Sequence, residues 1–288
     1  MISGGKMSRE KNVEIFEDTK YLVKSNKRVK ESVQNSTNRQ KLILEKDVLP
    51  VPKLELYEED AKVIVSKKRT FEAAAGYKGE KVAVHNFASA SNPGGGVVRG
   101  ANAQEECLCR CSGLYFCLDT LSMKKGFYEP HRKSQDPIHN DDIIFTPDVL
   151  VFKSDTANPV LMKEKDWYEV DVITCAAPNL RERPSNAYNS GDGNKKVKVS
   201  DKELLRIHEK RLRRILDVAA LEGDEVVILG AFGCGAFSNN PDVVALAAKN
   251  VIKDYRKAFK VIEFAVYCSP KDDKNYKTFD RVLKSLTK

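Results

Sequence analysis

Short apolar runs that alternate with segments of helical periodicity constrain the fold of this chain more than any other feature. Six runs rich in β-branched and aromatic residues read VIV, VAVHNF, VLVF, VDVITCAA, EVVILGAF and VIEFAVYC, at residues 63–65, 82–87, 149–152, 170–177, 225–232 and 261–268. Between several of them, apolar residues recur at helical spacing over residues 103–122, 201–221 and 241–258. Strands that are apolar on both faces and alternate with helices predict an α/β fold with a largely parallel sheet covered by helices.

The first 60 residues differ in character from the rest of the 288-residue chain. Residues 8–25 alternate charged residues with apolar ones and predict a helix. Residues 26–40, NKRVKESVQNSTNRQ, are polar without a clear period and predict a linker or mobile arm. The expected organisation is an N-terminal helical extension and linker over residues 1–60, followed by one α/β domain over residues 61–288.

The cysteines and the apolar content bear on compartment and metal binding. The seven cysteines are an odd number, mostly in apolar contexts, and the first residues lack the apolar segment typical of a secretory signal. We expect reduced thiols in a cytoplasmic protein, and no membrane partner, because no stretch approaches the roughly 20 apolar residues of a membrane span. Cys107 and Cys111 share one face of an expected helix with leucines, so we expect core packing there and no metal site.

The net charge of +8 favours anionic partners, and part of the excess lies in one run. Residues 194–215, NKKVKVSDKELLRIHEKRLRRI, contain nine Lys or Arg against three acidic residues. Such a run can bind nucleic acid directly, or it can be the solvated face of a helix in a lysine-rich protein. No RNA-recognition, zinc-finger or P-loop motif accompanies it, so direct nucleic-acid binding has no support beyond charge.

The remaining polar stretches and histidines suggest no chemistry of their own. Residues 181–200 have almost no apolar content and predict a surface loop, either a lid or a mobile segment. His208 lies on the apolar stripe of an expected helix and His85 lies inside an expected strand, so both are expected in the core or an interface. His131 and His139 lie in a polar stretch, and nothing in the sequence predicts that they pair.

Three consecutive glycines, Gly94–Gly96, follow a predicted strand and precede a predicted helix, directly after Asn92 and a proline. In open α/β sheets, ligands bind beyond the carboxyl ends of the strands. Glycines there allow backbone N–H groups to face an anion without an intervening Cβ. A flexible turn is the alternative, but a turn rarely needs three glycines in a row.

A second glycine loop, GAFGCGAFSNNPD at residues 230–242, also follows a predicted strand. Asn239 or Asn240 as N-cap, followed by proline, predicts a helix start whose free N–H groups and dipole favour an anion. The spacing matches neither the G-x-G-x-x-G dinucleotide motif nor a P-loop. Phe232, in strand register, is expected in the core, and Phe237, in the loop, is expected to face a ligand. Two such loops suit a ligand with two phosphates.

Glu105 and Glu106 lie at the start of the helix predicted after the first glycine loop. Asn102 as N-cap with Glu105 three residues later forms a capping-box pattern, which gives Glu105 a structural explanation. Glu106 has no such explanation, because a second carboxylate beside an anion site adds repulsion. A carboxylic acid there can protonate a leaving oxygen and then activate water, as in the cleavage of a glycosidic bond. A helix N-terminus lowers the pKa of a nearby carboxyl group, which opposes the acid role, whereas ligand phosphates raise that pKa and favour the role. Which effect on the pKa is larger stays open at this point.

The arrangement GGG, seven residues, QEE resembles the signature of poly(ADP-ribose) glycohydrolases. The segments NFASASNPGGGVVRGANAQEECLCRCSGLY, VITCAAPN and LGAFGCGAFSNNP are similar to the microbial-type branch of that family, in the macrodomain superfamily. The similarity runs in order over about residues 8–288. It implies a macrodomain-like mixed, largely parallel sheet between helices over residues 61–288. It also implies ADP-ribose as ligand and poly(ADP-ribose) on modified proteins as substrate, without cofactor or metal.

The resemblance further implies roles for individual residues. Glu106 corresponds to the catalytic acid/base, and Glu105 corresponds to the residue that orients the ribose being cleaved. The other residues that it places against the ligand are Asn92, Gly94, Gly95, Gly96, Val97, Gln104, Gly233, Cys234, Gly235, Ala236 and Phe237. We therefore expect a glycosidase that releases ADP-ribose. The alternatives are a macrodomain that binds ADP-ribose without cleaving it, which the paired glutamates disfavour, and a hydrolase of single ADP-ribose units on protein or nucleic acid.

Overall fold

A seven-stranded mixed sheet forms the centre of the protein, whose computed structural model describes residues 8–186, 191–269 and 272–287. The strands are β1 (Lys41–Ile43), β2 (Lys62–Ser66), β3 (Val82–Phe87), β4 (Ile143–Val151), β5 (Tyr168–Cys175), β6 (Val226–Leu229) and β7 (Val261–Ala265). Their order is β1-β4-β5-β3-β6-β7-β2. The five strands from β5 to β2 run parallel, whereas β4 is antiparallel to both β5 and β1. The predicted largely parallel sheet is confirmed, with an antiparallel edge.

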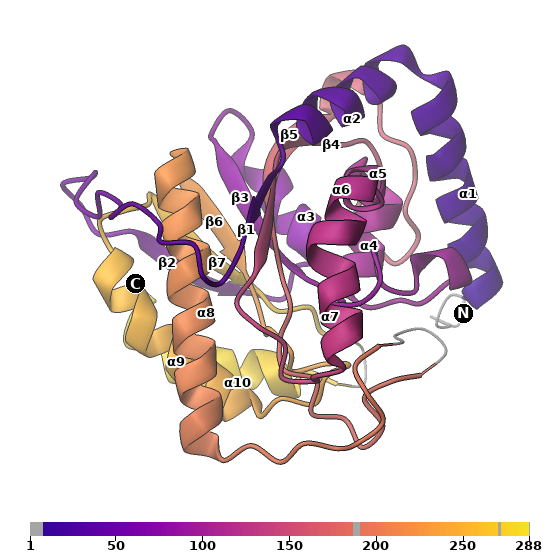
Figure 1. The fold of residues 1–288 in the computed structure, drawn as a ribbon. Helices are drawn as coiled ribbons and strands as arrows, with labels where there is room; N and C mark the ends of the chain where they lie inside the picture. Colours follow the sequence, from indigo (N-terminus) through magenta and orange to yellow (C-terminus); the bar gives the residue numbers. More distant parts are fainter. Residues whose placement is uncertain (1–7, 187–190, 270–271, 288) are drawn as a thin grey trace, which may run out of the picture.

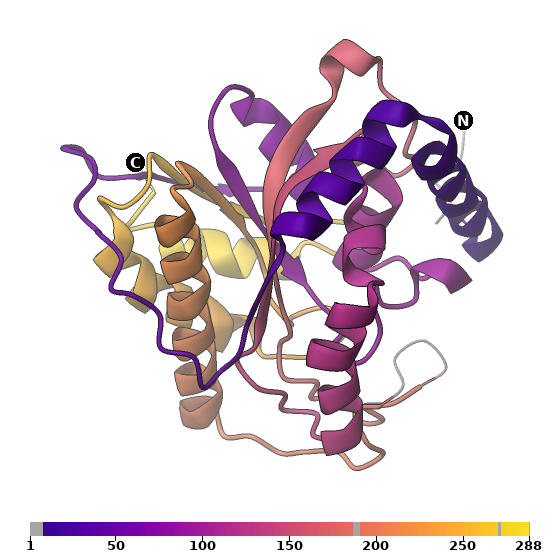
Figure 2. The ribbon, with the colours of Figure 1, turned by 45° about the horizontal axis from the view of Figure 1, so that its top comes forward.

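Helices cover both faces of this sheet (Figure 1). They are α1 (Arg9–Ser25), α2 (Lys27–Arg39), α3 (Thr70–Ala74), α4 (Gln104–Cys111), α5 (Leu114–Leu118), α6 (Leu121–Met123), α7 (Glu129–Ser134), α8 (Asp201–Glu222), α9 (Pro241–Ile252) and α10 (Lys274–Leu283). Helices α8 to α10 pack on one face and α3 to α7 on the other (Figure 2). Each layer has its own apolar core, because the central strands are apolar on both faces.

The segment predicted as one helix over residues 103–122 is divided into α4, α5 and α6, so that prediction is wrong. Ser112 has an extended backbone, with a φ of −148°, and forms a β-bridge with Val151. A Cβ on Gly113 would lie 2.7 Å from Cγ2 of Val33, in α2. Helix α4 therefore ends just before Ser112, where the chain touches the sheet and α2 approaches closely.

Residues 27–39 form a helix, so the linker predicted over residues 26–40 is wrong. The side chain of Asn26 caps α2 by accepting a 3.1 Å hydrogen bond from the N–H of Val29. A small apolar cluster joins the two N-terminal helices to β4, and its buried members are Val23, Val29, Leu150, Phe152 and Trp167. Because few residues of α2 make this contact, the sequence shows no clear apolar period there.

The N-terminal extension packs as part of the same unit as the rest of the chain. The predicted boundary between residues 60 and 61 falls between β1 and β2, which are strands of one sheet. Lys153, only 2% exposed, lies under α1. Its ammonium group donates to the carbonyl of Ile15 and the hydroxyl of Thr19, both at 2.8 Å, and pairs with Asp18 at 2.7 Å. A buried ammonium group with three acceptors ties α1 to the segment that follows β4.

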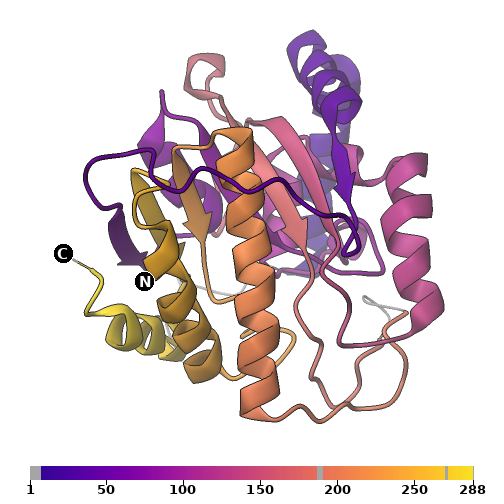
Figure 3. The same ribbon diagram turned by 60° about the vertical axis from the view of Figure 1, so that its left-hand side comes forward.

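Residues 44–60 run across the layer of α8 and α9 before the chain enters β2 (Figure 3). The guanidinium group of Arg214, on α8, donates to the carbonyls of Leu44 and Asp47. The N–H of Leu56 donates to the carbonyl of Lys257 at 2.9 Å. These contacts fix the path of a segment that has no helix or strand of its own.

Helix α8 carries much of the basic run predicted over residues 194–215, and several of its cations bind groups of the protein itself. Arg211 is 2% exposed and pairs with Asp141 at 2.8 Å. Lys210 pairs with the same carboxylate at 2.5 Å, and Arg213 pairs with Asp254 at 2.6 Å. The run therefore offers less free positive charge than its composition suggests.

The four histidines are all buried. For His85 and His208 this confirms the prediction, and burial lowers the pKa of His85 to about 3 and that of His208 to about 4. The rings of His131 and His139 lie 6.0 Å apart, and Nε2 of His139 lies 3.3 Å from a carboxylate oxygen of Asp192. The sequence did not suggest that these two histidines pair, yet the fold brings their rings together and places Asp192 against His139.

The described part of residues 181–200 contains no helix or strand, as predicted, yet it is not wholly a surface loop. Pro184 is buried, and Asp192 is only 1% exposed. All seven cysteines are unpaired, and no group of His, Cys, Asp or Glu side chains in the described ranges could hold a metal ion. No helix within those ranges is long and apolar enough to cross a membrane.

Candidate active site

A cleft of about 840 Å³ opens beyond the carboxyl ends of the parallel strands. Its walls come from the loops after β2, β3, β5, β6 and β7, and from the first turns of α1 and α4. Because the strands are parallel, loops that are distant in the sequence converge on one edge of the sheet. Both predicted glycine loops and both glutamates therefore meet in one cleft.

Gly95 lies directly against the two glutamates. Its φ of +59° favours glycine, and a Cβ there would come 2.5 Å from Oε1 of Glu106 and 3.1 Å from Oε2 of Glu105. Gly94 is similarly crowded, since a Cβ would meet the ring of Tyr115 at 2.7 Å. These glycines are thus required for the fit of the loop against α4 and α5, a reason that differs from the ligand approach expected from the sequence.

Glu106, rather than Glu105, closes the cap of α4. The N-cap residue is Ala103, and its N–H donates to Oε2 of Glu106 at 2.9 Å. Oε1 of Glu106 accepts a second hydrogen bond of 2.9 Å from the N–H of Gly96. The predicted cap of Asn102 with Glu105 is therefore wrong, because the helix begins one residue later. Two backbone donors thus fix the Glu106 carboxylate in the wall of the cleft.

Glu105 is more deeply buried than its neighbour, at 3% exposure against 7% for Glu106. Its oxygens accept hydrogen bonds from the N–H of Ser89 at 2.7 Å and from Nδ2 of Asn86 at 3.3 Å. Burial, followed by the charge of Glu106, raises the pKa of Glu105 well above its ordinary value, although these hydrogen bonds lower it. The cleft thus contains one carboxyl group that tends to keep its proton, next to another held by backbone donors.

Gln104 ties the start of α4 to the sheet. Its Oε1 accepts a hydrogen bond from the N–H of Phe87 at 2.9 Å. Its Nε2 donates to the carbonyl of His85 at 2.7 Å and to the hydroxyl of Thr70 at 3.0 Å. Both hydrogens of the amide are used within the protein, so Gln104 positions the two glutamates that follow it.

The second glycine loop presents unpaired backbone N–H groups to the cleft. Gly235, Ala236 and Phe237 line the cleft, and their N–H groups donate to no residue in the described chain. Asn239 holds this loop in shape, because its amide donates to the carbonyls of Gly233 at 3.1 Å and Phe237 at 3.2 Å. Successive free N–H groups form a site that favours an anion such as phosphate.

The two asparagines predicted as alternative caps of α9 have different roles. Asn240 is the N-cap, and its side chain accepts a hydrogen bond from the N–H of Asp242 at 3.1 Å. Asn239 is 2% exposed, and its Oδ1 lies 2.8 Å from Nε2 of His208. Since the amide oxygen only accepts, His208 carries its hydrogen on Nε2 and helps to hold the loop.

Of the two phenylalanines of this loop, Phe232 lies in the core as predicted and also borders the cleft, whereas the contact of Phe237 with a ligand stays a prediction. Phe232 is 6% exposed and packs with its ring centroid 4.4 Å from that of His85. Phe237 is half-buried and lines the cleft. The guanidinium group of Arg181 lies 5.4 Å from the centroid of the Phe237 ring, which places a cation beside the loop with free N–H groups.

The structure brings together most of the predicted site residues. Those that line the cleft are Gly95, Gln104, Glu105, Glu106, Gly233, Gly235, Ala236 and Phe237. Those outside its lining are Asn92, Gly94, Gly96, Val97 and Cys234. Val97 has no exposed surface and packs in the core, so its side chain cannot contact a ligand. Gly96 acts on the cleft through its hydrogen bond to Glu106.

Other cleft residues were not predicted from the sequence: Arg9, Asn12, Arg69, Asp155, Arg181 and Tyr267. The guanidinium group of Arg69 lies 4.0 Å from the ring centroid of Tyr267. Burial raises the pKa of Asp155 to about 6. These residues come from five separate segments and no short motif marks them, so only the fold shows that they share a cleft.

Comparison with known proteins agrees with this geometry. The family model described as microbial-type PARG, catalytic domain, where PARG denotes poly(ADP-ribose) glycohydrolase, matches residues 9–154. The poly(ADP-ribose) glycohydrolase of Thermomonospora curvata bound to the inhibitor ADP-HPD superposes with a TM-score of 0.76 at 28% identity, over 94% of this chain and 99% of that one. The enzyme of Deinococcus radiodurans in complex with ADP-ribose gives a TM-score of 0.70 at 29% identity, over 89% and 98%.

A search of the curated proteins gave no match. The family match spans half of the chain and includes the first glycine loop and both glutamates. The structural matches extend the similarity over most of the chain. The chain therefore belongs to the microbial-type poly(ADP-ribose) glycohydrolase family and is a glycosidase.

Proposed function

We propose that the protein hydrolyses ribose–ribose glycosidic bonds of poly(ADP-ribose) and releases ADP-ribose, with Glu106 as both acid and base. The observation that carries this proposal is the position of Glu106. Its carboxylate lies in the cleft wall, held by the N–H groups of Gly96 and Ala103, in the same cleft as a loop with free N–H groups. A carboxyl group near a phosphate site is the arrangement that cleavage of a bond to an ADP-linked ribose requires.

The reaction needs one proton that leaves Glu106 and returns to it. Glu106 donates the proton to the departing ribose oxygen while the bond between that oxygen and the anomeric carbon breaks, and an oxocarbenium-like centre forms. The Glu106 carboxylate then accepts a proton from water as the water oxygen attacks the anomeric carbon. The residue ends in its starting state, so a single carboxyl group serves both steps.

The neighbouring groups orient the substrate. Glu105, buried beside Glu106, is suited to hold a hydroxyl group of the ribose being cleaved. The free N–H groups of residues 235–237 suit the diphosphate, and the ring of Phe237 offers an apolar surface to the ribose. The Deinococcus radiodurans relative solved with ADP-ribose supports this choice of ligand.

Incubation with auto-modified poly(ADP-ribose), followed by analysis for free ADP-ribose, tests the activity. Glu106→Gln has no transferable proton, so its rate should fall on the order of 10²–10⁴-fold. Calorimetry should show that this variant still binds ADP-ribose. Near-normal cleavage by Glu106→Gln would contradict the assignment of the acid/base. Binding of ADP-ribose without release by wild type would identify a reader.

Three narrower proposals concern the attachment of the polymer, nucleic-acid binding and the location of the protein. We infer that the polymer is attached to modified proteins, and a comparison of rates on polymer, on singly modified protein and on singly modified nucleic acid tests this choice. Direct nucleic-acid binding through residues 194–215 has only charge in its favour, and a salt-dependent gel shift with unmodified RNA checks it. A cytoplasmic location stays a prediction, which cell fractionation would check.

A further inference from the structure

We propose that Arg181 is a phosphate-binding residue of this active site, held in position by the buried side chains of Asn179, Asp192 and His139. The inference rests on the proposed function, because the ligand group it assigns to Arg181 is the diphosphate of ADP-ribose.

Arg181 is fixed beside the second glycine loop at several points. Its guanidinium group lies 5.4 Å from the ring centroid of Phe237, and the N–H of Leu180 donates to the carbonyl of Phe237 at 2.9 Å. Nε of Arg181 donates to Oδ1 of Asn179 at 3.0 Å, and Nη2 donates to the carbonyl of Pro184 at 2.6 Å. Nη1 donates to no residue in the described chain, so the guanidinium group keeps donors for an anion.

Arg181 forms no ion pair with the carboxylates of the described residues, and the charge of Asp192 compensates it only in part. Burial lowers the pKa of Arg181, and the charge of Asp192 only partly opposes this effect. A phosphate group would supply the missing negative charge through short, charge-assisted hydrogen bonds. Among the three described arginines that line the cleft, Arg181 is the one in contact with Phe237, whereas Arg69 lies over Tyr267.

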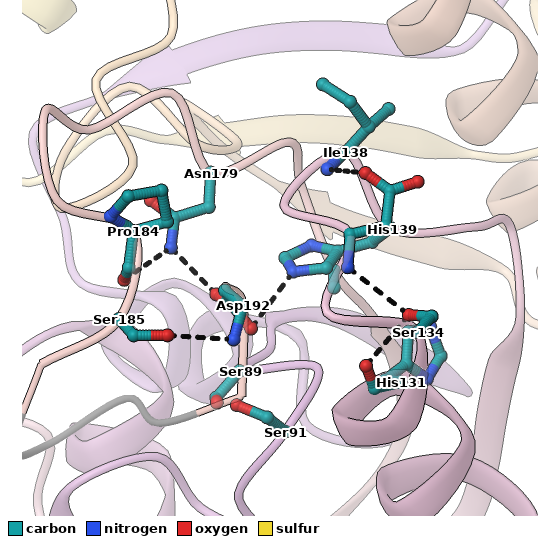
Figure 4. Close-up of polar contacts among 12 residues, drawn as sticks. Ser89, Ser91, His131, Ser134, Ile138, His139, Asn179, Pro184, Ser185 and Asp192 are labelled. Atoms are coloured by element: carbon teal, nitrogen blue, oxygen red, sulfur yellow. Dashed lines mark hydrogen bonds and ion pairs between the residues drawn. The ribbon is translucent and has the colours of Figure 1, made fainter. Parts of the chain in front are cut away.

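The amide of Asn179, which Arg181 contacts, also binds the buried carboxylate of Asp192 (Figure 4). Asn179 has no exposed surface, and its Nδ2 donates to Oδ2 of Asp192 at 2.7 Å and to the carbonyl of Pro184 at 3.0 Å. Both amide hydrogens are thus used, and the oxygen is left for Arg181. The amide orientation that presents this oxygen to Arg181 therefore depends on Asp192.

The ring of His139 lies against the same carboxylate. Nδ1 of His139 lies 2.8 Å from the carbonyl oxygen of Ala177, which can only accept, so Nδ1 carries a hydrogen. Nε2 of the same ring lies 3.3 Å from Oδ1 of Asp192, and both side chains are 1% exposed. The ring thus packs against Asp192 on the side away from Asn179.

The other charged groups around His139 are engaged with other partners. The ring of His131, from α7, lies 6.0 Å away and is engaged with the carbonyl of Phe127 and with Asn140. Arg211, from α8, donates to the backbone carbonyl of His139 at 3.0 Å and is itself paired with Asp141. Oδ1 of Asp136 accepts from the N–H of Ile138 at 2.9 Å. Loss of the Asp192 carboxylate would remove an acceptor of Asn179 and so loosen the hold on Arg181.

Two measurements test the role of Arg181: ADP-ribose binding by calorimetry and steady-state cleavage of polymer. Arg181→Gln should weaken binding on the order of 10–100-fold, as expected for loss of hydrogen bonds to a charged group. It should raise KM more than it lowers kcat. The matched control is Arg183→Gln, because Arg183 is exposed and lies outside the cleft lining. The control should bind and cleave like wild type, with the melting temperature showing that all variants fold.

The positioning chain has a separate readout, rescue by a conservative variant. Asp192→Ala removes the oxygen that accepts from Nδ2 of Asn179, so the amide loses the contact that orients it. This variant should weaken ADP-ribose binding and raise KM more than it lowers kcat, whereas Asp192→Asn keeps an oxygen that can accept from Asn179 and should restore most of the affinity. If Asp192→Ala does not fold, Asn179→Ala removes the oxygen that Arg181 contacts and should weaken binding in the same way.

The outcomes separate this inference from the proposed function. Normal binding by Arg181→Gln, or wild-type affinity in a folded Asp192→Ala or Asn179→Ala variant, overturns the inference while leaving the glycohydrolase activity intact. Failure of wild type to release ADP-ribose from polymer contradicts the proposed function instead.

Discussion

The carboxylate of Glu106 accepts a 2.9 Å hydrogen bond from the N–H of Gly96, in the loop that leads into its own helix. Its other oxygen caps that helix at Ala103. The proposed catalytic group is therefore also a structural one. In Glu106→Gln, one backbone donor would face an amide N–H instead of an oxygen, so this variant should also lose about 1 kcal/mol of stability. A denaturant titration beside the kinetics separates the two effects.

Gly95→Ala should damage both stability and activity. The new Cβ would enter a left-handed backbone conformation and lie within 2.5 Å of Glu106 Oε1. The conformational cost alone is about 1–2 kcal/mol, and displacement of the carboxylate should lower kcat on the order of 10²-fold. The control is Gly76→Ala, at an exposed glycine whose Cβ would meet nothing within 4 Å. Equal melting temperatures for the two variants would contradict the crowding at Gly95.

Glu105→Gln should lower activity without lowering stability at neutral pH. In the folded protein the pKa of Glu105 is raised above its ordinary value of 4.5. The protonated carboxyl group therefore contributes stability that is complete below pH 4.5 and is lost as the pH rises through the folded-state pKa. Glutamine does not titrate and can still accept from the N–H of Ser89. The melting temperature of the variant relative to wild type should therefore increase with pH. A constant difference across that range would show that Glu105 does not titrate as inferred.

Asp155→Asn tests a second buried carboxyl group of the cleft. Burial raises the pKa of Asp155 from 3.8 to about 6, although its contact with the N–H of Phe71 lowers it. The stability that the protonated group contributes is complete below about pH 4 and is lost as pH rises to about 6, a change of about 3 kcal/mol. Chemical denaturation of both proteins at several pH values should show wild type losing this much relative to the variant. If the free energy of unfolding changed with pH equally in the two proteins, the raised pKa of Asp155 would be contradicted.

Arg211→Lys should be among the most destabilising single changes in α8. The guanidinium group donates to Asp141, to the carbonyl of Ala176 and to the carbonyls of residues 138 and 139. A lysine cannot reproduce this fork, so the loss should approach the roughly 3–5 kcal/mol of a broken buried pair. Arg213→Lys, at an exposed pair with Asp254, should cost about 1 kcal/mol or less. Urea titrations of both variants provide the comparison.

The sheet was predictable because its signal is local. Each central strand is a short apolar run, and burial on both faces requires such a run whatever lies around it. The break after α4 was not predictable, since it depends on a bridge from Ser112 to Val151 and on the approach of Val33 to Gly113. Helix α2 was missed for a related reason: its contact with the rest of the protein uses few apolar residues, too few to give a period.

The site was predictable where its residues are contiguous in sequence. The two glycine loops and the glutamates form short motifs, and the parallel sheet brings their strand ends together. The role of Glu106 in capping α4 was not predictable, because it depends on the helix starting after Ala103 instead of after Asn102. Arg69 and Arg181 reach the cleft from loops after other strands, and a single arginine in a polar loop carries no signal of its destination.

The contacts of α1 also bear on how the chain folds as it is made. The ammonium group of Lys153 binds the carbonyl of Ile15 across 138 residues of sequence, and β1 pairs with a strand about 100 residues later. Contacts of such long range form slowly, because a large loop must close before they contribute. Helices α1 and α2 leave the ribosome before β4, yet they cannot dock until β4 and Lys153 have been synthesised. Although they are made early, these two helices are thus among the later elements to reach their place.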